Sequence, residues 1–169
     1  MINIHPVLVH FPIAFLTIYA LLEVFVPKKI SSNETFWWIK FFTLWVGFLG
    51  SMSAVASGET AENTLNDRSL RYLVEYHASF AVLTEWIFGV LAVCYLVTFL
   101  KQKNKIPFYE KSFIRLVATL SEKVLAFSRP LAFVGLIAVT VTGALGGAIV
   151  YGKDADPLVS FVYKIIIGN

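Results

Sequence analysis

Long apolar runs, separated by shorter polar segments, dominate the pattern of hydrophobic and polar positions along this chain. Each run exceeds the roughly 18 residues that an α-helix needs to cross the hydrocarbon core of a bilayer. Helices are the expected form, because a backbone exposed to lipid must satisfy its own hydrogen bonds. The runs cover about residues 7–27, 36–57, 74–100 and 129–151. The pattern predicts an all-α polytopic membrane protein, in which residues 1–169 form a single domain built as a four-transmembrane-helix bundle.

Two shorter segments outside these runs are predicted to form helices at the membrane surface. Between about residues 108 and 127, apolar residues recur at helical spacing, and charged residues occupy other positions around the helix. This pattern is typical of an amphipathic interfacial helix whose cations lie near anionic lipid. Asp156 is suited to cap a helix, and Pro157 suits its first position, so a short helix is predicted over about residues 157–167. We expect this last helix to lie on the outer surface or to pack on a partner.

The composition agrees with a membrane protein and argues against other classes. Of the 169 residues, 57% are hydrophobic, and the mean hydropathy of +0.72 is well above that of a soluble domain. A formal net charge of +3 is too small to indicate a nucleic-acid partner. The single cysteine, Cys94, cannot form an intrachain disulfide. No nucleophile or hydrolase motif is present, so the sequence predicts at most a redox carrier as far as enzymatic activity is concerned.

Cations gather in two of the connections between the apolar runs. The segment from Lys101 to Arg129 carries seven Lys and Arg residues and the segment 28–40 carries three, against two in the segment 57–73. The positive-inside rule therefore places the first two segments in the cytoplasm. Both termini and the 57–73 connection then lie on the outer side of a bacterial inner membrane.

This topology brings the three histidines of the chain to the outer side. His5 and His10 stand at the start of the first helix, and His77 stands at the start of the third. His5 and His10 are five residues apart, about 140° around a helix, so they would not share a face. His10 and His77 are therefore the predicted facing pair. Two imidazoles in an apolar slot can supply the axial ligands of a b-type haem, and Arg68 or Arg71 could pair with its propionates.

Two alternatives for the histidines stay open. In one, they only form hydrogen bonds, and the chain is a non-redox structural or assembly subunit of a larger membrane complex. In the other, His10 and His77 join acids in a mixed nitrogen and oxygen site for zinc, iron or copper. Glu59 and Glu62, three residues apart, would supply those acids if the second helix extends that far.

Two further acids lie inside apolar runs. Glu85 is about eight residues inside the third helix, and an intramembrane carboxylate is a functional candidate, for example as a proton relay. The alternative is that Glu85 is protonated and bonded to a neighbouring hydroxyl. Glu23, near the cytoplasmic end of the first helix, is expected to pair with Lys28 or Lys29.

Small residues cluster in two of the runs. The stretches "GFLGSMSAVASG" and "VTGALGGAIVYG" lie in the second and fourth helices. Such residues let helix backbones approach closely, and they could equally clear room for a flat macrocycle. The positions concerned are Gly47, Ser51, Ala54, Gly143, Gly146 and Gly147.

Two end motifs, "IHPVLVHFPIA" and "VTGALGGAIVYG", resemble the signature ends of a bacterial membrane-protein family, domain of unknown function 2231. The resemblance covers nearly the whole chain, and "EYHASFA" is similar to the Glu-x-His element of the family. It implies a four-helix inner-membrane protein whose motifs include His5, His10, His77, Gly143, Gly146, Gly147 and Tyr151. Ala78 stands where many relatives carry an acid, which disfavours an acid-assisted metal site with Glu75. The resemblance implies no activity, although fusions of family members to cytochrome-like domains point to redox work.

The leading hypothesis is a small b-type cytochrome-like electron carrier or a haem-bearing accessory subunit. We expect haem b as the cofactor, with a single transition metal or no cofactor as the alternative. The expected partners are the lipid bilayer and a cytochrome or a subunit of a respiratory complex. An oligomer is left open, and nucleic acid is not expected as a partner.

Overall fold

The computed structural model describes residues 4–31, 33–62, 68–102 and 112–168 of the chain. Every regular element within these ranges is helical, which confirms the predicted all-α fold. The elements are α1 (His5–Leu8), α2 (His10–Phe25), α3 (Lys28–Ser31), α4 (Glu34–Glu62), the 3₁₀ helix η1 (Arg68–Leu70), α5 (Arg71–Gln102), α6 (Ser112–Ala126), α7 (Ser128–Tyr151) and α8 (Pro157–Ile166).

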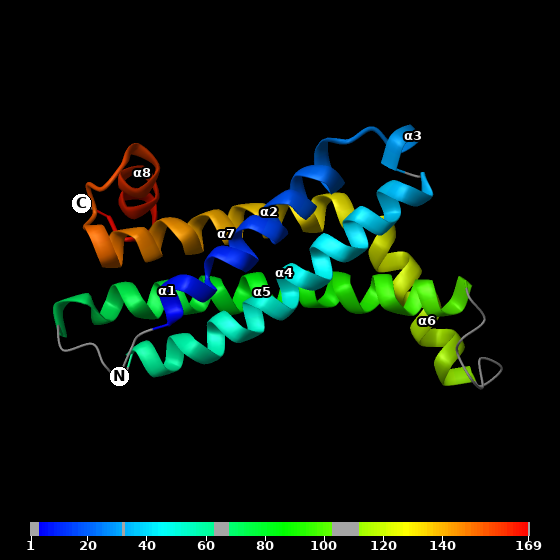
Figure 1. Ribbon diagram of the computed structural model, residues 1–169, viewed down its shortest axis with the longest axis horizontal. Helices are drawn as coiled ribbons and strands as arrows, with labels where there is room; N and C mark the ends of the chain where they lie inside the picture. The colour runs from blue at the N-terminus through cyan, green and yellow to red at the C-terminus, as the bar shows by residue number, and fades with distance from the viewer. Residues whose placement is uncertain (1–3, 32, 63–67, 103–111, 169) are drawn as a thin grey trace.

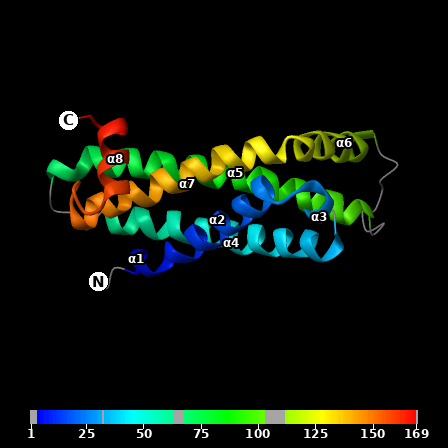
Figure 2. The ribbon, with the colours of Figure 1, turned by 90° about the horizontal axis from the view of Figure 1, so that it is seen from above.

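Four helical segments are long and apolar enough to cross a membrane. They are His5–Phe25, which combines α1 and α2, and the helices α4, α5 and α7. The four segments run along the long axis of the molecule in both views (Figure 1 and Figure 2). Large apolar side chains are exposed on all four, as a surface in contact with lipid requires. The predicted polytopic bundle of four spans is therefore confirmed.

Each span packs against two others, so the four helices close into a bundle. α2 contacts α4 and α7, and α5 contacts the same two helices. α6 packs on α5, and α8 packs on α7. The two chain ends and α8 lie at one end of the bundle, and α3 and α6 lie at the other (Figure 1). We name these the outer end and the inner end, after the predicted orientation.

In the core, glycines of one helix leave room for large apolar side chains of the neighbouring helix. A Cβ atom at Gly47 of α4 would lie 2.5 Å from a methyl carbon of Leu16 in α2. A Cβ atom at Gly135 of α7 would lie 2.7 Å from the ring of Phe88 in α5. Leu16 and Phe88 are fully buried. Glycine therefore sets the close approach of α2 to α4 and of α5 to α7.

The first span is interrupted one turn before Pro12. α1 ends at Leu8 and α2 begins at His10. Pro12 has no amide hydrogen, so it cannot bond to the carbonyl of Leu8 as a regular helix requires. Pro6 lies in the first turn of α1, where a missing donor costs nothing. The separate short helix α1 packs against α4.

Candidate functional site

Two of the three histidines meet at the outer end of the bundle. The imidazole rings of His5 and His77 have centroids 6.3 Å apart, and their planes are 88° apart. His5 is the first residue of α1, and His77 lies in the second turn of α5. His10, at the start of α2, is exposed. The structure thus pairs His77 with His5, where the sequence predicts His10, because the helical span begins at His5 and turns His5 toward α4.

Each of the two rings is anchored by a backbone carbonyl of another helix. Nδ1 of His5 lies 3.0 Å from the carbonyl oxygen of Ala54 in α4 and 3.0 Å from Oγ of Ser57. Nδ1 of His77 lies 2.9 Å from the carbonyl oxygen of Thr142 in α7. Because a carbonyl oxygen only accepts, Nδ1 must carry the hydrogen in both bonds. In the neutral imidazole, Nε2 then bears the lone pair, which is the tautomer that binds a metal through Nε2.

Glycines line both rings. A Cβ atom at Gly58 of α4 would lie 3.2 Å from Cε1 of His5. A Cβ atom at Gly146 of α7 would lie 3.2 Å from Cε1 of His77. Any larger residue at these positions would press on an imidazole. The sequence predicts Gly146 as a site residue but does not predict Gly58, because Gly58 lies in a polar helix end without a pattern of its own.

The other residues predicted for a cofactor lie farther out or serve packing. Gly147 borders Val159 of α8, and Gly143 borders Ile13 of α2. Tyr151, at the end of α7, is 80% exposed. Two arginines also lie at the outer end, where Arg71 is exposed at the start of α5 and Arg68 belongs to η1.

The acids of the alternative metal set occupy exposed positions. α4 does extend as far as Glu62, which places Glu59 and Glu62 on one helix, but both side chains are exposed. Glu75 is exposed on α5, and Glu85 is half-buried near the middle of that helix. Within the described ranges, no three His, Cys, Asp or Glu side chains form a group that could hold a metal ion. The geometry therefore does not support the mixed nitrogen and oxygen site.

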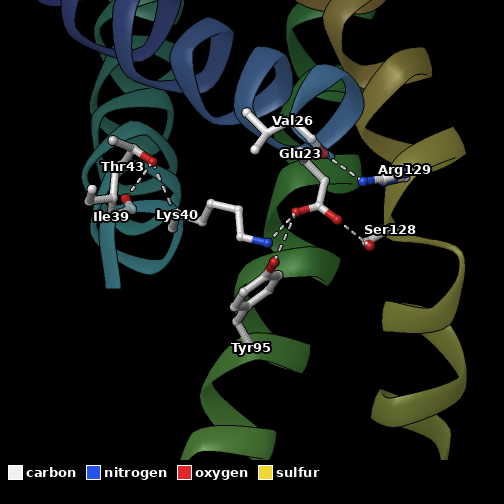
Figure 3. A network of polar contacts seen from close by, with 8 residues as sticks. All are labelled: Glu23, Val26, Ile39, Lys40, Thr43, Tyr95, Ser128 and Arg129. Atoms are coloured by element: carbon white, nitrogen blue, oxygen red, sulfur yellow. Dashed lines mark hydrogen bonds and ion pairs between the residues drawn. The ribbon is translucent and has the colours of Figure 1, made fainter. Parts of the chain in front are cut away.

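A second polar site lies at the inner end, and all four spans contribute to it (Figure 3). The buried carboxylate of Glu23 in α2 accepts a hydrogen bond from Nζ of Lys40 in α4 at 2.9 Å. It also accepts from the hydroxyl of Tyr95 in α5 at 3.1 Å and from Oγ of Ser128 in α7 at 2.6 Å. The side chains of Lys40 and Glu23 are only 6% and 7% exposed. We call these four residues the Glu23 cluster.

The Glu23 cluster corrects the predicted pairing of this acid. Lys28 and Lys29 lie in α3, beyond the end of α2, and the partner of Glu23 is Lys40. A buried charge needs an opposite charge and hydrogen bonds to offset its lost hydration. Lys40 stands inside the aromatic stretch "WWIKFF", and a cation in such a stretch is the signal that could have identified the pair. Arg129 of α7 also donates a hydrogen bond of 2.6 Å to the carbonyl of Val26, at the end of α2.

Similarity to a known protein family extends over both the histidine pair and the Glu23 cluster. A family model described as predicted membrane protein (DUF2231) matches residues 1–155. Searches of curated proteins and of solved structures gave no match. The matched range contains the four spans, the two paired histidines and the Glu23 cluster. The chain therefore belongs to the DUF2231 family of predicted membrane proteins.

Proposed function

We propose that this protein is a small membrane-embedded electron carrier, or a haem-bearing subunit of a larger redox complex. In this proposal, His5 and His77 bind a b-type haem near the outer face of a bacterial inner membrane. One observation carries the proposal: two imidazoles from different helices lie close together with their planes nearly perpendicular, and a backbone carbonyl accepts a hydrogen bond from Nδ1 of each. Metal-ligating histidines commonly donate the hydrogen of their second ring nitrogen in this way, which fixes the tautomer and the ring orientation.

The spacing of the two rings would allow both to bind one metal, each through Nε2. With a metal–nitrogen bond of about 2 Å, a ring centroid would lie about 3.2 Å from the metal, so two imidazoles that bind one metal would have centroids no more than about 6.4 Å apart. The observed separation between His5 and His77 is 6.3 Å. A haem bound there would supply one-electron transfer.

The chain's own residues would divide the work of holding such a group. The carbonyls of Ala54 and Thr142 orient the two rings. Gly58 and Gly146 keep the ring edges free of side chains. Arg71 lies exposed at the same end of the bundle, where a propionate could pair with it.

The side of the membrane on which the histidine pair would lie follows from the distribution of cations along the chain. The inner end carries α3 and the helix α6, which belong to the two cation-rich connections of the sequence. The positive-inside rule assigns that end to the cytoplasm. The histidine pair at the opposite end would then exchange electrons with a partner on the outer side.

A structural role is the second candidate, and the same hydrogen bonds favour it. The bond from His5 joins α1 to α4, and the bond from His77 joins α5 to α7. In a non-redox subunit of a larger complex, these bonds would serve only to fasten the outer ends of the helices. The two candidates differ in whether the pair also binds a metal.

Absorption spectra of the detergent-purified protein, oxidised and then reduced with dithionite, test the proposal, with metal analysis of the same sample. We expect sharp α and β bands that His5→Ala and His77→Ala each abolish. His10→Ala is the matched control, because His10 is exposed at the same end, and it should keep the bands. A featureless spectrum without stoichiometric metal, even after expression with added haem, would refute the haem. In that case a lowered melting temperature in His5→Ala and His77→Ala would support the structural role.

A further inference from the structure

The surface helix α6 has three strips with different surroundings, as its 100° rotation per residue shows. One strip packs on α5 and includes Ala118 and Ser121, which are 1% and 5% exposed. Next to it on one side is an apolar strip whose residues Phe113, Leu116 and Leu120 are 74%, 55% and 49% exposed. On the other side is a charged strip with the exposed Arg115 and Glu122. Lys123, also exposed, lies opposite the α5 contact and beside Leu116 of the apolar strip. The apolar and charged strips therefore point in different directions from the α5 contact.

Contacts with α5 show which strip of α6 faces which end of the bundle. Glu122, on the charged strip, accepts from Nζ of Lys101 at 2.6 Å, close to the inner end of α5. Ser121 lies at the edge of the packing strip that is nearer the apolar strip, and it contacts the thiol of Cys94. Cys94 lies about two turns nearer the middle of the bundle than Lys101. α6 crosses α5 at a steep angle (Figure 1). The charged strip thus faces the inner end, and the apolar strip faces the middle of the membrane.

The C-terminal helix α8 has the same design at the outer end. Val159 and Val162 are buried in its contact with α7. Its apolar strip contains Leu158, Phe161 and Ile165, which are 51%, 63% and 62% exposed. On the opposite side of α8, the hydroxyl of Tyr163 lies 2.6 Å from that of Tyr72, at the outer end of α5. The apolar strip of α8 therefore also faces the middle of the membrane.

The two surface helices differ in charge. At α6, the cations Arg115 and Lys123 and the Lys101 that pairs with Glu122 outnumber that one acid, so these four charges sum to +2. In contrast, residues 153–164 carry two lysines and two aspartates, which sum to no net charge around α8. An apolar strip toward the hydrocarbon and cations toward water match the polarity gradient of an anionic leaflet.

We propose that α6 is a binding surface for anionic phospholipid. Its apolar strip inserts among the acyl chains at the inner end, and Arg115 and Lys123 lie at the level of the phosphates. α8 inserts into the opposite leaflet and does not select headgroup charge. This inference is independent of any cofactor, because it rests on α6, α8 and the contacts of α6 with α5.

Quenching by spin-labelled lipid tests this surface on the full chain in vesicles of phosphatidylcholine and phosphatidylglycerol. In a Cys94→Ala background, a single cysteine that carries an NBD fluorophore replaces Leu120 on the apolar strip, Thr119 next to the charged strip, or Ile165 on α8. The quencher is a doxyl group on the acyl chain of one or the other lipid. Quenching by each doxyl lipid gives the relative affinity of the labelled site for the two headgroups, and aqueous iodide reports exposure to water.

We expect doxyl lipid to quench the labels at Leu120 and Ile165, and iodide to quench the label at Thr119. At Leu120 the anionic lipid should be preferred by at least about fivefold, the effect of one cation near the membrane surface. Arg115→Gln with Lys123→Gln should abolish that preference, and Ile165 should show none. Equal affinity for both lipids at Leu120 would overturn the proposal. Quenching of the label at Leu120 by iodide would also overturn it, because the apolar strip would then face water. Quenching by neither quencher would overturn it too, because another protein or a second copy of the chain would then cover the strip.

Discussion

The Glu23 cluster should make a large contribution to the stability of the bundle, and Glu23→Gln tests this. Lys40 and Glu23 are 6% and 7% exposed, so glutamine would remove the negative charge that pairs with a buried ammonium. Removing one member of a buried ion pair costs about 3–5 kcal/mol. Glutamine keeps the shape of the side chain, and its amide oxygen can still accept from one of the two hydroxyls, of Tyr95 or of Ser128, while its NH2 group donates to the other. Since each kcal/mol shifts the melting temperature of a chain of this size by roughly 2–4 °C, we expect a loss of about 10 °C.

The chain contains its own reporter for this measurement. Cys94 is the single cysteine of the sequence, and it is only 7% exposed in α5. A fluorogenic maleimide should therefore react with it mainly as the bundle unfolds, so a thermal melt in mild detergent gives the midpoint for each variant. Glu23→Leu combined with Lys40→Met removes both charges, and it should recover most of the stability that Glu23→Gln loses.

The matched control is the exposed pair of Lys101 and Glu122. Their side chains are 35% and 48% exposed, although the ion pair itself is short at 2.6 Å. Exposed pairs contribute at most about 1 kcal/mol, so Glu122→Gln should shift the midpoint by less than about 4 °C. Equal shifts for Glu23→Gln and Glu122→Gln would contradict the electrostatic role of the Glu23 cluster. Failure of the double variant to recover stability would contradict it too.

Two further substitutions test packing and capping. Gly47→Ala should destabilise the bundle by about 1–3 kcal/mol, because the added Cβ would lie 2.5 Å from a methyl carbon of Leu16 and 3.0 Å from its backbone nitrogen. Gly143→Ala, where the nearest atom would be 3.9 Å away, should melt almost unchanged in the same thiol assay, and equal midpoints would disprove the close approach of α2 and α4. Asp156→Ala should destabilise α8 by about 1 kcal/mol, because its carboxylate accepts from two amides in the first turn. Faster hydrogen exchange in α8 but not in α7 is the expected signature, and unchanged exchange would show that the cap is dispensable.

The spans could be predicted from the sequence, but the rotation of each span about its axis could not. A bilayer demands about 20 apolar residues for each crossing, and such runs are plain in the sequence. Lipid and protein core are both apolar, however, so hydrophobicity does not separate the inward face of a span from the outward face. His5 and His10 illustrate this limit. Their separation around the helix shows that they face different ways, but only packing shows that His5 faces α4 and His77.

Partners across helices were equally hard to predict. The nearest cations along the chain, Lys28 and Lys29, suggest a local pair for Glu23. In the bundle, antiparallel packing of α2 and α4 brings Lys40 to the same depth as Glu23, 17 residues away in sequence. No spacing rule links two such positions, because their meeting depends on the length of the connection between the helices and on their crossing. What the sequence does contain is a charge of each sign inside two neighbouring apolar runs.

The Glu23 cluster also sets an order of events during biosynthesis. Lys40 follows Glu23 after 17 residues, Tyr95 after 72 and Ser128 after 105. At about 5–20 residues per second, roughly 5–20 s pass between synthesis of the acid and synthesis of its last hydrogen-bond donor. The opposite charge is made first, within the first helical hairpin, and the two neutral donors arrive with later spans. The nascent chain can thus enter the bilayer with its acid already neutralised, and each new helix completes one more bond to it.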